Sequence, residues 1–198
     1  MAYTYQQDGH NFYVLIFPSA NTTWVYDAAT NAWHERAAWT NGDFTRHRSN
    51  CQMAFNNEIV VGDFQNGNIY AFDLDDYTDN NQIQKWLRSW RALPTGQNNL
   101  KRTTQHSLQL DLETGTGLNL GQGDDPQVML RWSDDGGHTW SNEHWISIGK
   151  IGQFYRRAIW RRLGMTLKLR DRVYEVSMTD PVKTAIMGAE LIVSPTNA

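Results

Sequence analysis

Apolar and polar residues alternate with a period of two in short runs along most of this chain. In Ser107–Glu113 the leucines occupy every second position, so they point to one face of a strand while Gln109 and Asp111 point to the other. This pattern predicts a strand with one buried and one hydrated face. Similar runs, bounded by turn residues, predict strands at Phe12–Phe17, Thr22–Asp27, Ala32–Trp39, Ser49–Phe55, Glu58–Phe64, Asn68–Leu74, Gln127–Ser133, Thr139–Ile148, Arg156–Leu163, Arg172–Thr179 and Ala189–Ser194.

The residues between these runs suit tight turns. The pairs Asn56-Asn57 and Asn66-Gly67 tolerate the positive φ angles that two-residue hairpin turns require. We therefore expect small antiparallel meanders. Residues Gln84–Leu93 are compatible with an amphipathic helix or with a long strand, and we favour the strand.

The N-terminal meanders resemble blades of a β-propeller. An aromatic residue and an aspartate close a strand just before a turn at Tyr26-Asp27 and again at Phe72-Asp73. A propeller closes with about 4 to 8 blades of about 40 to 50 residues, and the chain holds two clear ones. We expect an all-β protein with propeller-like antiparallel blades that stay incomplete, over 1–102, and a β-sandwich-like or further blade region over 103–198. A single continuous domain is the alternative.

One motif is specific. It matches the Asp-box hairpin pattern S-x-D-x-G-x-T-W at all its defining positions, which are Ser133, Asp135, Gly137, Thr139 and Trp140. We expect Asp135 to cap backbone amides of the turn, the glycines to supply positive φ, and Trp140 to pack beneath the turn. The motif indicates a structure and not an activity.

Composition is that of a packed globular protein. The 198 residues are 40% hydrophobic and 20% charged, with nine tryptophans, which argues against disorder. A net charge of −3 and a pI near 6.0 exclude a generally basic nucleic-acid binder. Cys51 has no partner for an internal disulfide, and we expect it to be buried and inert. No long apolar run or secretory signal is present, so we expect a soluble, unsecreted protein without a membrane span.

The sequence offers no catalytic constellation. The six histidines show no metal-ligand spacing, and no nucleophile or nucleotide-binding motif occurs. Sialidase chemistry needs several arginines around one carboxylate, whereas the arginines here come as adjacent pairs that point to opposite faces of a strand. We expect no enzyme activity and no cofactor. A calcium site at Asp73, Asp75 and Asp79 is a weak possibility beside the simpler interpretation as a polar turn.

Basic residues gather between positions 150 and 172, where Asp171 is the one acidic residue. One interpretation is a hydrated sheet face whose charges pair with the acidic stretch 63–79. The other is a surface that contacts an acidic protein or nucleic-acid phosphates. The candidates for such contacts are Arg156, Arg157, Arg161, Arg162, Arg170 and Arg172.

Four segments together carry a family resemblance. Residues 9–36, 61–80, 125–164 and 172–182 resemble the C-terminal part of the packaged-DNA stabilisation proteins of short-tailed phages and prophages, with 132–141 and 149–157 as the most specific portions. The resemblance implies a structural tail accessory protein of the virion, present in the bacterial cytoplasm during assembly. It would help close the head–tail channel and retain packaged DNA. Its partners would be connector and tail proteins, with several copies around the tail axis and close to the packaged DNA.

Two alternatives remain open. One is a carbohydrate-binding or sialidase-like Asp-box propeller, which would present paired exposed aromatic residues on one face. The other is a nucleic-acid-binding module, whose affinity would fall steeply with salt.

Overall fold

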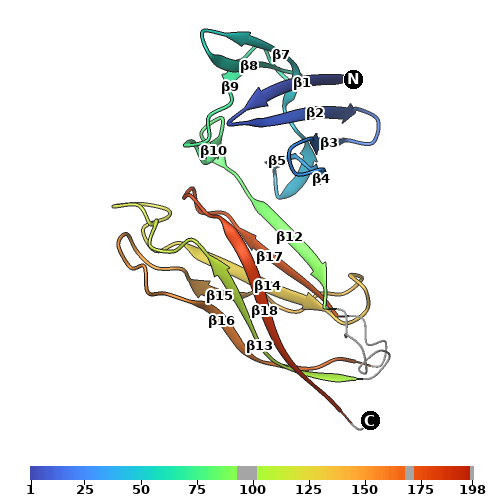
Figure 1. The fold of residues 1–198 in the computed structure, drawn as a ribbon, viewed down its shortest axis with the longest axis vertical. Helices are drawn as coiled ribbons and strands as arrows, with labels where there is room; N and C mark the ends of the chain where they lie inside the picture. The colour runs from blue at the N-terminus through green and yellow to red at the C-terminus, as the bar shows by residue number, and fades with distance from the viewer. Residues whose placement is uncertain (93–101, 168–171, 197–198) are drawn as a thin grey trace. The chain divides into compact units, whose positions relative to one another are not determined.

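The fold is all-β, as the alternating patterns predict. In the computed structural model, which describes residues 1–92, 102–167 and 172–196, every regular element is a β-strand (Figure 1). The chain divides into two compact units, Met1–Gln84 and Lys85–Ala198. All strand pairs among the described residues are antiparallel, and none of the sheets closes on itself.

The N-terminal unit is built from meanders. Its largest sheet has the order β1-β2-β3-β4, and three smaller sheets, β5-β6, β7-β8-β9 and β10-β11, follow along the chain. The core side chains of the large sheet are Tyr5, Val14, Ile16 and Val25. The strands are β1 (Ala2–Gln7), β2 (His10–Phe17), β3 (Thr22–Asp27), β4 (Ala32–Glu35), β5 (Ala37–Thr40), β6 (Asp43–Arg46), β7 (Ser49–Phe55), β8 (Glu58–Asp63), β9 (Ile69–Ala71), β10 (Thr78–Asp79) and β11 (Gln82–Ile83).

The two asparagine-containing turns behave differently. Asn56 and Asn57 both have positive φ, at 49° and 64°, and join β7 directly to β8 as predicted. The prediction for Asn66-Gly67 is wrong, because neither residue has positive φ. There the Asn66 side chain accepts a hydrogen bond from the Asn68 amide at 2.8 Å, and this side-chain cap supports a wider connection between β8 and β9.

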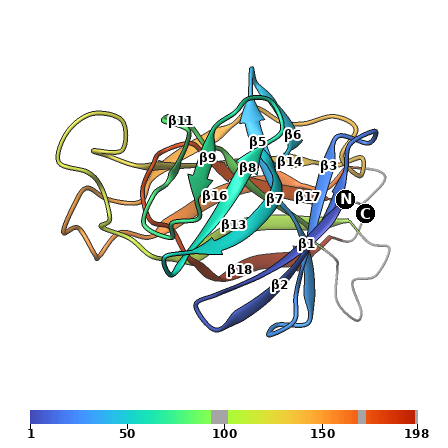
Figure 2. The ribbon, with the colours of Figure 1, turned by 90° about the horizontal axis from the view of Figure 1, so that it is seen from above.

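The C-terminal unit is a β-sandwich, one of the two arrangements expected from the sequence. One sheet has the order β12-β17-β14-β15 and the other β16-β13-β18 (Figures 1 and 2). Residues 84–93 contribute a strand, as favoured above, and this strand pairs with β17. The strands are β12 (Trp86–Arg91), β13 (Thr103–Leu112), β14 (Gln127–Ser133), β15 (His144–Ser147), β16 (Ala158–Met165), β17 (Val173–Met178) and β18 (Ile186–Pro195).

The core of the sandwich follows the period-two pattern. The β13 leucines are at most 6% exposed, while Asp111 on the other face is exposed, so the predicted stripe is confirmed. Facing them are buried residues of the other sheet, chiefly Val128, Leu130 and Val176. Burial of these side chains on one face of each sheet is what holds the two layers together.

Candidate functional site

The turn after β14 is organised by one carboxylate. Asp135 Oδ1 accepts hydrogen bonds from the amides of His138 and Thr139, each at 2.9 Å, and Oδ2 accepts one from the Thr139 hydroxyl at 2.7 Å. The buried Ser133 hydroxyl donates to Oδ1 at 2.6 Å and accepts from the Gly137 amide at 2.9 Å. The Ser133 hydrogen bond, followed by those of Thr139, holds the pKa of Asp135 far below its usual range. The carboxylate therefore serves the turn and is not a proton donor near neutral pH.

Trp140 packs against this turn. Its indole is half-buried and lies against Gly137, whose φ is 104°. The Arg131 guanidinium lies 4.7 Å from the indole centroid and also pairs with Glu175 of β17. The turn is thus attached to the four-stranded sheet by a cation–π contact and an ion pair.

Arg172 is not a surface contact, contrary to our expectation. Its side chain is 2% exposed and forms a two-pronged ion pair with Asp134, at 2.6 and 2.8 Å. The same guanidinium donates to the carbonyl oxygens of Leu163 at 2.8 Å and of Met165 at 3.2 Å. Because all of these partners are internal, Arg172 ties β16 to the turn after β14 and is unable to reach another molecule.

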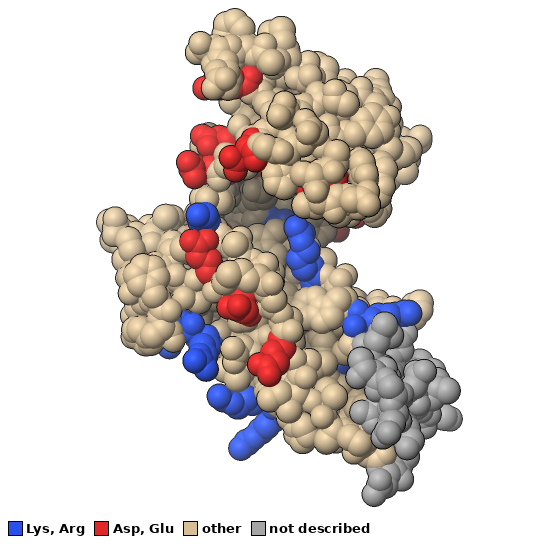
Figure 3. Space-filling model, viewed as in Figure 1, with Lys and Arg blue, Asp and Glu red and all other residues tan. Residues whose placement is uncertain are grey.

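Four of the other candidate arginines reach solvent. Arg156, Arg157, Arg161 and Arg162 are exposed, and Lys and Arg side chains project along the part of the C-terminal unit where β16 runs (Figure 3). Arg170 lies outside the described residues. Arg161 and Arg162 are adjacent on β16 and were expected on opposite faces, but both are exposed because Arg162 has a φ of 61° at an irregularity in the pairing with β13.

Aromatic side chains accompany these arginines. Phe154 is 73% exposed and Tyr155 is 77% exposed, directly before Arg156. We call residues 154–157 together with Arg161 and Arg162 the aromatic–basic surface. Trp160 does not belong to it, because the indole is buried and donates to the His144 carbonyl at 2.9 Å.

Backbone hydrogen bonds stabilise the loop that carries Phe154 and Tyr155. The Gly152 amide donates to the Gly115 carbonyl at 3.0 Å, and the Gln153 amide donates to the Lys150 carbonyl at 2.9 Å. Gly149 has a φ of 101°, and a Cβ there would lie 2.8 Å from the Gln153 carbonyl oxygen, so only glycine fits. The aromatic pair is therefore presented to solvent on an ordered loop, which lowers the entropic cost of binding.

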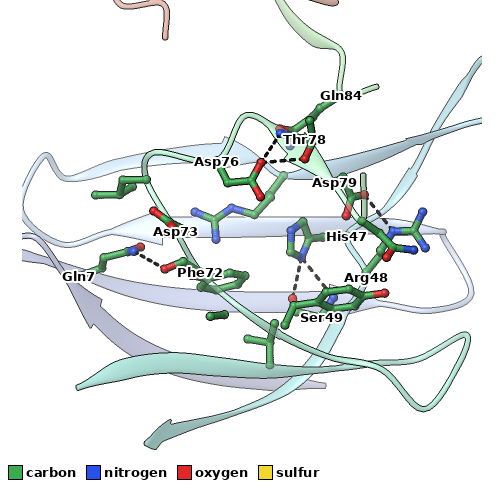
Figure 4. Close-up of a pocket in the computed structure, with 16 residues that line it drawn as sticks. Gln7, His47, Arg48, Ser49, Phe72, Asp73, Asp76, Thr78, Asp79 and Gln84 are labelled. Carbon is green, nitrogen blue, oxygen red and sulfur yellow. Dashed lines mark hydrogen bonds and ion pairs between the residues drawn. The ribbon is translucent and has the colours of Figure 1, made fainter. Parts of the chain in front are cut away.

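The N-terminal unit contains a polar pocket of about 300 Å³ (Figure 4). On its wall His47 Nδ1 accepts from the Ser49 amide at 3.2 Å and lies 2.7 Å from the Ser49 hydroxyl, which lies 2.5 Å from the Tyr3 hydroxyl. Burial, followed by the charges of Arg36 and Arg48, lowers the pKa of His47 to about 3. A base so weak does not activate a serine, and Ser49 itself is only 1% exposed, so this Ser–His pair is structural.

The acidic residues of the pocket are also engaged. Arg48 pairs with Asp79 at 2.9 Å and with Asp63 at 3.8 Å. Asp73 and Asp76 accept hydrogen bonds from the amides of Asp75 and Thr78 in their own turn. Within 1–92, 102–167 and 172–196, no group of three or more His, Cys, Asp or Glu side chains is placed to hold a metal ion. Of the candidate calcium ligands, Asp73 thus caps its own turn by accepting from the Asp75 amide, and Asp79 is an ion-pair partner of Arg48.

Comparison with known proteins identifies the family. The family described as "Bacteriophage P22 Gp10, beta-sandwich" matches residues 85–194, more than half of the chain and nearly all of the C-terminal unit. The chain belongs to this family. As a Gp10-type protein it is a phage structural protein and a part of the virion, which implies interaction with other virion proteins. No curated protein is significantly similar to it.

Some features of the Gp10-type protein were not visible in the sequence. Phe154 was not predicted to be a contact residue, although an aromatic pair preceded by two glycines and followed by two arginines, in a segment without alternation, marks an exposed loop. Cys51 is exposed and not buried as expected, because its strand β7 is largely open to solvent. In the part of the chain that the structure describes, no helix is long and apolar enough to cross a membrane.

Proposed function

We propose that this Gp10-type protein is a tail accessory protein that helps close the head–tail channel of a short-tailed phage and retain the packaged DNA. The observation that carries the proposal is the match of the C-terminal sandwich to the phage P22 Gp10 family. The resemblance of the remaining segments to packaged-DNA stabilisation proteins supports the more specific role.

The proposed mode of action is protein–protein contact through the aromatic–basic surface. Exposed aromatic side chains next to arginines are the residues that most often dominate binding energy at protein interfaces. Phe154 and Tyr155 would be buried against a connector or tail protein, while Arg156 and Arg157 would pair with its carboxylates. We further propose that several copies of the chain surround the tail axis. Each copy would then present the same aromatic–basic surface to the adjoining connector or tail protein.

The experiment uses phage particles assembled without this protein and then supplied with the purified chain. We expect particles without it to lose their DNA and the wild-type chain to restore DNA-filled particles. The double variant Arg156→Glu, Arg157→Glu should restore at least about tenfold fewer DNA-filled particles than the wild-type chain. The reason is that charge reversal turns attraction at the interface into repulsion. The matched control is Lys183→Glu, which reverses an exposed cation elsewhere on the same unit.

Two results would contradict the proposal. One is full DNA retention by particles that lack the protein. The other is binding of the chain to free double-stranded DNA, with an affinity that falls steeply with salt, combined with no binding to connector or tail complexes. The second result would instead support the nucleic-acid-binding alternative.

A further inference from the structure

The sandwich has one long sheet edge that no described residue covers. Strand β18 is ten residues long and pairs with β13 on one side only. Most of its residues are exposed, among them Met187 at 69% and Ile192 at 53%. On the free side, every second residue of an antiparallel edge strand presents an N–H and a C=O group without a strand partner.

The opposite edge of the same sheet is different. Strand β16 carries exposed Arg161 and Arg162 and an irregular register at Arg162. Charged side chains and bulges are the features by which proteins block unwanted strand addition. Strand β18 has no lysine or arginine, and its proline, Pro195, is at its very end; its charged side chain is Glu190, and Met187 forms a bulge in the pairing with β13. The part of its edge that is open to pairing is therefore 188–194.

A groove of about 740 Å³ runs beside this edge, between β18 and the edge strand β12 of the other sheet. Its walls include Trp86, Trp90, Leu110 and Ile186. Ile186 lies opposite the buried Leu112 and so faces the interior of the sandwich, yet it is 39% exposed. The apolar core is thus incompletely covered at this edge, and it has room for side chains from one more strand.

One of the described residues that line the groove, Arg88, carries a positive charge. Arg88 lies opposite the buried Val176 in the β12–β17 pairing, which places it on the groove side of its strand. Its guanidinium donates to the Leu87 carbonyl at 2.8 Å, and none of the described carboxylates pairs with it. A ligand that fills this groove therefore needs a carboxylate among its apolar side chains.

We propose that the β18 edge is a strand-addition site, which takes an extended segment of another virion protein as an added antiparallel strand. Alternate apolar side chains of the segment fill the groove between Trp86, Trp90 and Ile186, and a glutamate or aspartate among them pairs with Arg88. Main-chain hydrogen bonds to β18 supply affinity, and the groove supplies selectivity. The groove residues Trp86, Arg88 and Trp90 are not part of the aromatic–basic surface, although residues 154–157 and 188–190 line a common depression. The proposal does not depend on the role in DNA retention.

The test uses the full chain and a capped peptide of about ten residues that alternates valine with threonine and has one central glutamate. Two signals report binding: a shift in tryptophan fluorescence from Trp86 and Trp90, and protection of β18 amides from hydrogen exchange. We expect saturable binding with both signals. Replacing the peptide's glutamate by lysine should weaken binding at least about tenfold, and Arg88→Glu in the protein should reverse that preference.

Backbone pairing is tested by N-methylation of the peptide. Methyl groups on alternate amides block one edge of the peptide strand and leave the other edge intact. Of the two methylated peptides, we expect one to lose binding and the other to retain it. Arg161→Glu is the protein control, because it changes the aromatic–basic surface and should leave peptide affinity unchanged.

Three outcomes of the peptide experiment would overturn the proposal. They are absence of binding by the glutamate peptide, equal binding of the two methylated peptides, and protection confined to a region other than β18. A concentration-dependent dimer that protects the β18 amides without peptide would also overturn it, since the edge would then be occupied by a second copy. Failure of strand addition leaves the phage-particle test of the aromatic–basic surface unaffected.

Discussion

At the residue scale, arginines of similar sequence context have opposite roles. Arg172 is buried and satisfied by Asp134 and two carbonyl oxygens, whereas Arg156, Arg157 and Arg161 are exposed. Charge clustering predicted all of them as one surface. It failed for Arg172 because the partner, Asp134, is 38 residues away and comes close only through the pairing of β14 with β17.

Replacement of Arg172 by alanine should destabilise the sandwich strongly. Asp134 would lose its ion-pair partner in a largely enclosed position, and two carbonyl oxygens would lose their donor. We expect the free energy of unfolding to fall by about 3 kcal/mol, as when one partner of a buried ion pair is removed. Urea denaturation at pH 7 measures this, with Arg161→Ala as the control that should change stability by less than about 0.5 kcal/mol. Equal effects of the two substitutions would show that the Arg172 pair is not structural.

His47 should make the stability of the N-terminal unit depend on pH. Its pKa is about 3 in the folded protein and near 6.5 when exposed to water, so below pH 6.5 the unfolded state binds the additional proton. Stability is therefore full above pH 6.5 and falls as the pH drops from there toward 3. Between pH 7 and pH 5, where carboxylates contribute little, we expect a loss of about 1 to 2 kcal/mol. His47→Gln should remove most of this slope in urea denaturation, and an unchanged slope would assign it to other groups.

At the scale of single elements, strand positions were the most predictable feature. The β13 stripe, β3, β7 and β14 lie where alternation and turn residues placed them, because a period of two is a local property. The run 32–39 is in fact two strands, β4 and β5, separated at Arg36, which local pattern did not reveal. The pairing of β12 with β17 also could not be read from the sequence, since the two strands are about 80 residues apart and no motif marks their contact.

The β13 stripe gives a direct test of the sandwich core. Leu108 is fully buried, so Leu108→Ala should leave a cavity and lower the free energy of unfolding by about 3 kcal/mol. Its neighbour Gln109 points to the other face, and Gln109→Ala should change stability by less than about 0.5 kcal/mol. Thermal and urea denaturation measure both. A small effect at Leu108 would mean that the face of this strand is assigned wrongly.

At the scale of the whole molecule, each unit has a core of its own. The buried cluster of the N-terminal unit is formed within residues 5–25, and that of the sandwich within residues 108–182. The sequence predicted the all-β class and a sandwich as one option for the C-terminal part. It could not decide between sandwich and blade, because both bury the same alternating faces and differ only in which strands are neighbours.

Separate cores predict separate unfolding. Val14 is fully buried in the N-terminal unit, and Val14→Ala should speed amide hydrogen exchange in the strands of residues 1–84 about tenfold. Exchange in β13, β14 and β17 should stay unchanged. Hydrogen exchange followed by mass spectrometry resolves the two regions. A similar increase across both units would show that they unfold as one cooperative body.

The difference between the two edge strands of the three-stranded sheet, β16 and β18, has a consequence for assembly. A sheet that could add strands at both edges would link molecule to molecule without limit and would risk forming fibres. With arginines and an irregular register on β16, growth is blocked on that flank. Of the two edges of this three-stranded sheet, β18 is the one left to accept a neighbour, so the sheet would acquire one additional strand and then stop.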